Sequence, residues 1–133
     1  MAEQGFHESV VKADKWSKPI ALVVAIAVFL LANRLTADVQ FSSIIAAAVG
    51  IGTRFYVPYH ASVRVPEPDR IPLHEHPVTG SYHHGAAGLS LVVASFVALG
   101  VFLLVHGFLT AIGVGVIFGV VLYFVFSWWI LTD

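Results

Sequence analysis

Residues 87–132 read AGLSLVVASFVALGVFLLVHGFLTAIGVGVIFGVVLYFVFSWWILT and contain no Asp, Glu, Lys or Arg. A single helix over this range would be about 69 Å long at 1.5 Å per residue, whereas the hydrocarbon core of a bilayer is only about 30 Å thick. The stretch must therefore turn once, and His106-Gly107 is the polar and flexible break near its middle. Because a segment in lipid must satisfy its own backbone hydrogen bonds, the stretch predicts two transmembrane helices, over His84–Val105 and Phe108–Leu131.

The composition of the whole chain supports a place in lipid. The chain has 133 residues, of which 58% are hydrophobic and 11% charged, against about 25% charged in an average soluble domain. A net charge of −1 provides no basic face for nucleic acid. The chain has no cysteine, which excludes disulfides, thiolate zinc sites, iron–sulfur clusters and cysteine nucleophiles.

The first half of the chain holds two weaker apolar segments. Pro19–Leu35 is just long enough to span a bilayer, for which about 17–25 residues are usual. The second segment, Val39–Tyr59, contains one charge, Arg54. It spans if Arg54 lies near an interface and extends its guanidinium to the headgroups. Tyr56 and Tyr59 just beyond Arg54 are typical interfacial anchors.

These segments predict an all-α membrane protein with four transmembrane helices in two antiparallel hairpins. The N-terminal segment 1–18, the first hairpin 19–59, the Pro/His-rich loop 60–86 and the second hairpin 87–133 follow in that order. With four spans, six basic residues fall on the side of the termini and only Arg34 on the other. The positive-inside rule then predicts that both termini and the 60–86 loop are cytoplasmic. The six are Lys12, Lys15, Lys18, Arg54, Arg64 and Arg70.

The N-terminal segment has its own pattern. Opposite charges four residues apart, combined with apolar residues, predict a short interfacial helix lying on the membrane surface. The residues concerned are Glu8 with Lys12, Asp14 with Lys18, and Phe6, Val10 and Trp16. Lysines, an apolar run and Leu35-Thr36-Ala37 also have the outline of a cleaved signal peptide. The long polar leader favours an uncleaved first helix.

Small residues recur along the predicted helices. Four of them are spaced four residues apart in the fourth helix, and this spacing puts them on nearly one face. Small side chains let a neighbouring helix approach closely, which holds helices together in lipid. We interpret the pattern as packing inside the monomer, with a face for a partner helix or a second copy as the alternative. The predicted packing residues are Gly107, Ala111, Gly115 and Gly119, with Ser90, Ala94 and Ala98 in the third helix and Ala46 and Gly50 in the second.

The 60–86 loop carries a group of histidines that we name the histidine cluster: His74, His76, His83 and His84. Neutral imidazole is the commonest metal ligand near neutral pH, and Glu75 adds a carboxylate. The cluster therefore suggests a zinc or copper site, although its spacing matches no specific metal motif. The alternatives are a pH-sensing role, solvated loop residues, or headgroup-level histidines at the start of the third helix.

The absence of charged residues at the predicted bilayer centre argues against ion-coupled transport, which usually needs them. No nucleophile motif or phosphate-binding loop is present, so we predict no catalytic residue, and no cofactor is expected apart from the histidine-bound metal. The leading hypothesis is a non-catalytic structural or accessory subunit of a membrane assembly, or a homo-oligomer, acting through small-residue helix packing. The alternatives are a metal-binding or redox accessory protein and a passive small-solute pore. The expected partners are the lipid bilayer and other membrane subunits or the chain itself, with no nucleic acid.

Overall fold

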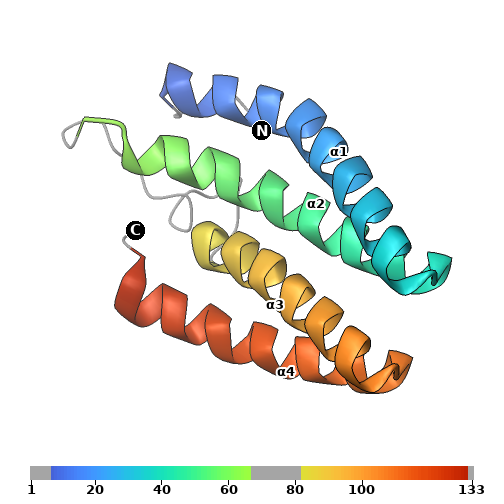
Figure 1. Cartoon of the computed structure of the whole chain (residues 1–133). Coiled ribbons are helices and arrows are strands. Elements are labelled where there is room, and N and C mark those ends of the chain that lie inside the picture. Colours follow the sequence, from blue (N-terminus) through green and yellow to red (C-terminus); the bar gives the residue numbers. More distant parts are fainter. Residues whose placement is uncertain (1–6, 67–81, 132–133) are drawn as a thin grey trace.

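The computed structural model describes residues 7–66 and 82–131, and all regular structure within them is helical (Figure 1). Four of the helices are long and apolar enough to cross a membrane. This confirms the predicted fold class of four transmembrane helices. The elements are α1 (Glu8–Thr36), α2 (Val39–Val63), α3 (His84–Val105) and α4 (Phe108–Val125), which continues into the short π-helix η3 (Phe126–Ile130).

The two hairpin turns are short because the chain caps its helix ends locally. Ala37 ends α1 in the left-handed conformation, with φ 54°, and the side chain of Asp38 accepts a hydrogen bond from the Phe41 amide at 2.9 Å. His106 ends α3 in the same way, with φ 56°, and its amide donates to the Phe102 carbonyl at 2.8 Å. The second turn lies at the predicted His106-Gly107 break.

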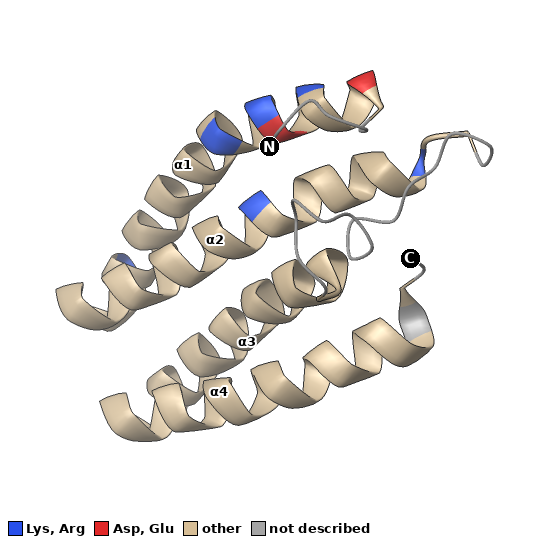
Figure 2. Cartoon of the chain, turned by 180° about the vertical axis from the view of Figure 1, so that it is seen from behind, with Lys and Arg blue, Asp and Glu red and all other residues tan. Residues whose placement is uncertain are grey.

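The α1 helix is longer than the sequence suggested. It includes residues 8–18 of the segment predicted to be a separate interfacial helix, and Pro19, predicted to open the first span, lies inside it. Phe6 of that segment lies outside the described residues. We name residues 8–18 the α1 arm. Figures 1 and 2 show that α1 bends along its length, and Pro19 supplies a cause because it cannot donate a hydrogen bond to the preceding turn.

The α1 arm packs against the C-terminal part of α2. Val10 is buried in a cluster with Tyr59 and Val65, whereas Trp16 on the same arm is 57% exposed. The two apolar residues expected to share one membrane-facing surface therefore point in different directions. The position of the arm relative to a membrane surface stays a prediction.

The helices are arranged mainly in chain order, with α1 against α2, α2 against α3 and α3 against α4. Figure 1 shows α1 and α4 at the two edges of this row. Phe41 lies at the centre of the core near the turns, with its ring stacked on Phe102 at 4.4 Å and edge-on to Phe108 at 6.0 Å. The central helices α2 and α3 are consequently much more buried than α1 and α4.

The start of α1 and the end of η3 lie at the end of the molecule opposite the two turns (Figure 1). We call this the loop end. Figure 2 shows that most of the Lys, Arg, Asp and Glu residues in the described parts of the chain lie toward it. The structure therefore places the first residues of α1 and the last residues of η3 at the same end of the bundle, and the cytoplasmic orientation of that end remains a prediction from charge.

Candidate functional site

The small residues of α3 and α4 meet each other inside the chain. A Cβ added to Gly115 would lie 2.9 Å from the Ala98 Cβ, and one added to Gly119 would lie 3.4 Å from the Ala94 Cβ. Ala111 on the same face of α4 is fully buried. Gly115 and Gly119 therefore face α3 inside the second hairpin. Their role in helix association stays a prediction.

The other predicted packing residues have more varied positions. Ala46 is buried in the core, and Gly50 faces α1, since a Cβ added there would lie 3.2 Å from the Ala25 Cβ. Ser90 is buried, and its hydroxyl donates to the Ala87 carbonyl of its own helix at 3.0 Å. Gly107 precedes α4 as its N-cap residue.

Helices α2 and α3 also approach each other closely at a glycine pair, Gly52 and Gly88, that was not among the predicted packing residues. A Cβ on Gly52 would lie 2.6 Å from the Gly88 carbonyl oxygen, and one on Gly88 would lie 2.5 Å from the Gly52 carbonyl oxygen. Gly85, one turn away, packs against the ring of Tyr59. The Gly85-Ala86-Ala87-Gly88 spacing was a usable signal for this contact. Spacing alone does not identify the partner helix, because the contact depends on how α2 and α3 cross.

An apolar groove of about 530 Å³ opens beside these contacts, between α2 and α4 and over α3. Its polar side chains are few. The Ser90 and Ser95 hydroxyls donate to carbonyls of α3 itself, and the Tyr123 hydroxyl accepts from the His83 amide at 3.2 Å. The groove is lined by Ile44, Ile45, Ala48, Ala87, Ser90, Leu91, Ala94, Ser95, Ala98, Ile112, Gly115, Val116, Gly119, Val120, Tyr123 and Phe124. We name it the α2–α4 groove.

Histidine and tyrosine side chains pack together where α2 meets the start of α3. His83 caps α3, since its Nδ1 accepts from the Ala86 amide at 3.0 Å, and its ring lies 5.1 Å from that of Tyr59. His84 is buried and stacks on Tyr82 at 4.1 Å. Burial raises the pKa of the Tyr82 phenol above its ordinary value of 10.0, and the neighbouring Tyr123 hydroxyl adds to the rise.

Two of the four residues of the histidine cluster lie in the described part of the chain. His83 contacts the Ala86 amide and the Tyr59 ring, and His84 stacks on the Tyr82 ring. His74 and His76 lie outside the described residues. In the parts of the chain that the structure describes, no three His, Cys, Asp or Glu side chains come close enough together to hold a metal ion. The histidine cluster as a zinc or copper site therefore stays a prediction.

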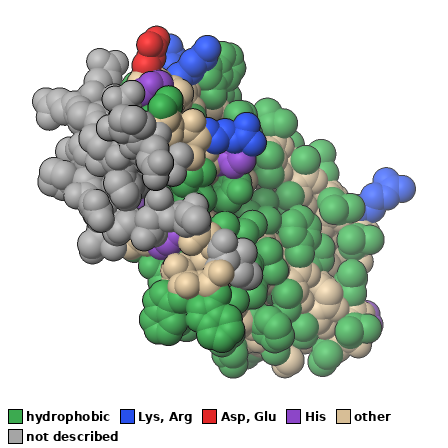
Figure 3. Space-filling view, turned by 90° about the vertical axis from the view of Figure 1, so that its left-hand side faces the viewer, with side chains coloured by type: hydrophobic (Ala, Val, Ile, Leu, Met, Phe, Trp, Pro, Cys, Tyr) green, Lys and Arg blue, Asp and Glu red, His purple; other side chains and the backbone are tan. Residues whose placement is uncertain are grey.

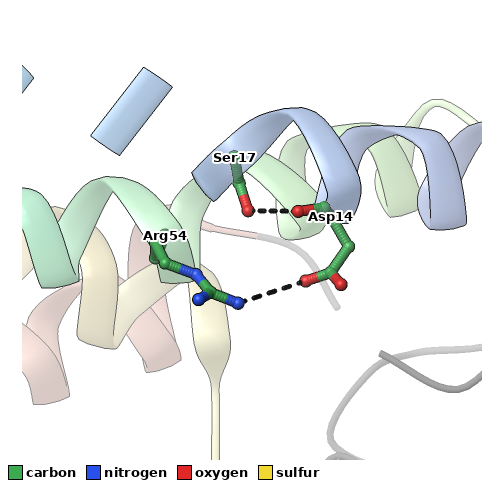
Figure 4. A network of polar contacts seen from close by, with 3 residues as sticks. All are labelled: Asp14, Ser17 and Arg54. Carbon is green, nitrogen blue, oxygen red and sulfur yellow. Dashed lines mark hydrogen bonds and ion pairs between the residues drawn. The ribbon is translucent and has the colours of Figure 1, made fainter. Parts of the chain in front are cut away.

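Arg54, the one charge expected within the second span, has a specific partner. Its guanidinium lies 3.9 Å from a carboxylate oxygen of Asp14 on the α1 arm, and its side chain remains 44% exposed (Figure 4). Ser17, fully buried one turn further along, donates to the Asp14 carbonyl at 2.6 Å. The carboxylate thus neutralises part of the charge that the sequence analysis assigned to lipid headgroups alone.

Figure 3 views the loop end and shows apolar side chains over much of the visible described surface, with the charged side chains gathered mainly toward one side.

The chain matches no known family, no curated protein and no solved structure. The fold and these sites therefore define its class by themselves. It is a small multi-pass helical membrane protein.

Proposed function

We propose that this protein is a non-catalytic membrane subunit that packs against a transmembrane helix of another subunit or of a second copy. The α2–α4 groove is the observation that carries this proposal. It is apolar, it lies between helices long enough to span the membrane, and its lining includes Ala48, Ala94 and Gly119. Small residues of this kind allow close approach of a helix in lipid, where van der Waals packing supplies much of the association energy.

The groove chemistry favours packing over solute passage. The Ser90 and Ser95 hydroxyls already donate to carbonyls one turn back in α3. They are therefore poorly placed to replace the hydration shell of a polar solute. This arrangement supports a helix-packing surface over the passive pore considered from the sequence.

The proposal includes the orientation predicted from charge, with the loop end in the cytoplasm. Arg34 is the one basic residue near the turns, and the lysines of the α1 arm lie at the other end. The same rule of cytoplasmic positive charge supports this assignment. Labelling of single cysteines at Ala37 and Ser9 in sealed right-side-out vesicles tests it. Position 37 should react with an impermeant reagent added outside and position 9 should not, and the reverse pattern would contradict the assignment.

Site-specific crosslinking tests the groove. Val116 lines it, whereas Val121 lies on the same helix outside it, and the two side chains are similarly exposed at 60% and 54%. A photoreactive residue at position 116 should crosslink to a defined protein, either a second copy or one identified partner, while position 121 should not. Lipid adducts alone at both positions would contradict the proposal.

A matched pair of substitutions provides the control. Ala48→Leu fills part of the groove, whereas Ala47→Leu adds the same side chain to an exposed neighbouring position that does not line it. The crosslink from position 116 should be lost in the first variant and kept in the second. Gly115→Leu is a poorer test, because that residue already contacts Ala98 and its replacement disturbs the fold.

A further inference from the structure

The α1 arm has two faces of different chemistry. Val10, Asp14 and Ser17 are buried and lie along the side that faces α2. The opposite side is exposed and carries three cations together with an indole ring. We name this exposed side the basic face: Lys12, Lys15, Trp16 and Lys18.

The carboxylate of Asp14 does not balance the positive charge of the basic face, although its spacing from Lys18 suggested that it would. The sequence suggested that Asp14 would pair with Lys18 one turn away, but its carboxylate turns toward Arg54 on α2. Within residues 7–66 and 82–131, the structure shows no ion pair for any of the three lysines. Glu8 at the start of the helix is the remaining exposed acid of the arm, so the basic face keeps an excess of positive charge.

The register of the helices gives the depth of this face. Close contacts connect Asp14 to Arg54 on α2, Gly52 to Gly88 near the start of α3, and Ala94 to Gly119 on α4. The arm therefore lies level with the first turns of α3 and the last turns of α4. The latter run into Trp128 and Trp129, which are 73% and 84% exposed, and exposed tryptophan is typical of the membrane–water interface.

Position and charge together indicate one kind of partner. The face lies at headgroup depth on a helix at the edge of the row (Figure 1), and its side chains are exposed on the side of the arm opposite the buried residues. Lysines at that depth extend their ammonium groups toward phosphates, and anionic lipids attract basic segments beside a span. We propose that the basic face of the α1 arm is a binding surface for the phosphate headgroups of anionic lipids. This proposal does not depend on the occupant of the α2–α4 groove.

Lipid selectivity of the full chain tests the proposal. The protein is reconstituted in phosphatidylcholine vesicles, and electron spin resonance compares spin-labelled phosphatidylglycerol with spin-labelled phosphatidylcholine at its surface. The unmodified chain should prefer the anionic lipid, and the preference should weaken with added salt. Each lysine contributes up to about five-fold, so the combined change Lys12→Gln, Lys15→Gln and Lys18→Gln should remove most of the preference.

Two controls separate this result from a general effect of charge or folding. Arg34→Gln removes one cation at the opposite end and should leave the preference unchanged. Replacement of the three lysines by arginine keeps the charge and should keep the preference, and circular dichroism should show equal helix content in all variants. Retention of the full preference in the glutamine variant, or an equal loss in Arg34→Gln, would overturn the proposal. A single Lys15→Gln change, expected to weaken the preference in part, serves if the combined variant does not fold.

Discussion

The contact between Gly52 and Gly88 gives the sharpest prediction for stability. Gly88→Ala would put a methyl group 2.5 Å from the Gly52 carbonyl oxygen and 2.8 Å from the Tyr56 amide nitrogen. Both atoms belong to the backbone of α2, so no side-chain rotation relieves the contact. The two central helices would have to separate until the closest distance approached the 3.4 Å of ordinary contact.

Overpacking of this kind typically costs about 1–3 kcal/mol. Alanine has a higher helix propensity than glycine by about 1 kcal/mol, which partly masks the loss. Gly100→Ala in the same helix is the matched control, because a Cβ there meets nothing within 4 Å. The difference between the two variants then isolates the packing term, and we expect Gly88→Ala to be less stable than Gly100→Ala by about 1–3 kcal/mol.

The measurement is the free energy of unfolding in mixed detergent micelles, followed by circular dichroism as the denaturing detergent is increased. Both variants should show a single transition, and the transition of Gly88→Ala should come at a lower denaturant fraction. Equal stability of the two variants would refute the close crossing of α2 and α3.

Three further predictions concern the loop end. A double-mutant cycle with Asp14→Asn and Arg54→Gln should give a coupling free energy of unfolding of about 1 kcal/mol or less, because the ion pair is long and partly exposed. A coupling free energy of zero would show that the pair does not hold the arm against α2. The raised pKa of Tyr82 means that the folded state favours the neutral phenol, so the contribution of Tyr82 to the free energy of unfolding is intact below pH 10 and is lost as the pH rises above that value. Tyr82→Phe should therefore weaken the loss of stability at alkaline pH. An unchanged dependence of stability on pH would exclude this residue as the cause. The metal hypothesis predicts zinc or copper in the purified protein by elemental analysis and its loss when all four residues of the histidine cluster become alanine; equal metal content in the two proteins would rule out the cluster as the ligand set.

Much of the fold was predictable because lipid imposes simple rules on sequence. The uncharged 87–132 stretch is too long for one span, and the polar and flexible break near its middle, His106-Gly107, is where the structure turns. The arm was harder to predict. Its charges four residues apart suggested local pairing, but Asp14 found its partner on another helix.

In the candidate sites too, the sequence predicted which residues allow close packing but not which helix packs against them. The spacing of Gly115 and Gly119 indicated a packing face, yet spacing alone does not show which helix covers it, and the structure places Ala98 and Ala94 against it. The contact between Gly52 and Gly88 joins residues far apart in the chain, and its existence depends on the crossing of α2 and α3. The α2–α4 groove likewise exists only because α4 packs on α3 at the edge of the row.

The sequence by itself determined that the chain belongs in a membrane, how many times it crosses and where its hairpins turn, because apolar length, backbone hydrogen bonding and capping act locally. Only the tertiary structure decided which small faces are used inside the chain, which carboxylate meets Arg54 and which surfaces remain for lipid or a partner. Those outcomes depend on the rotation and register of each helix against its neighbours, which many combinations of apolar side chains can satisfy equally well.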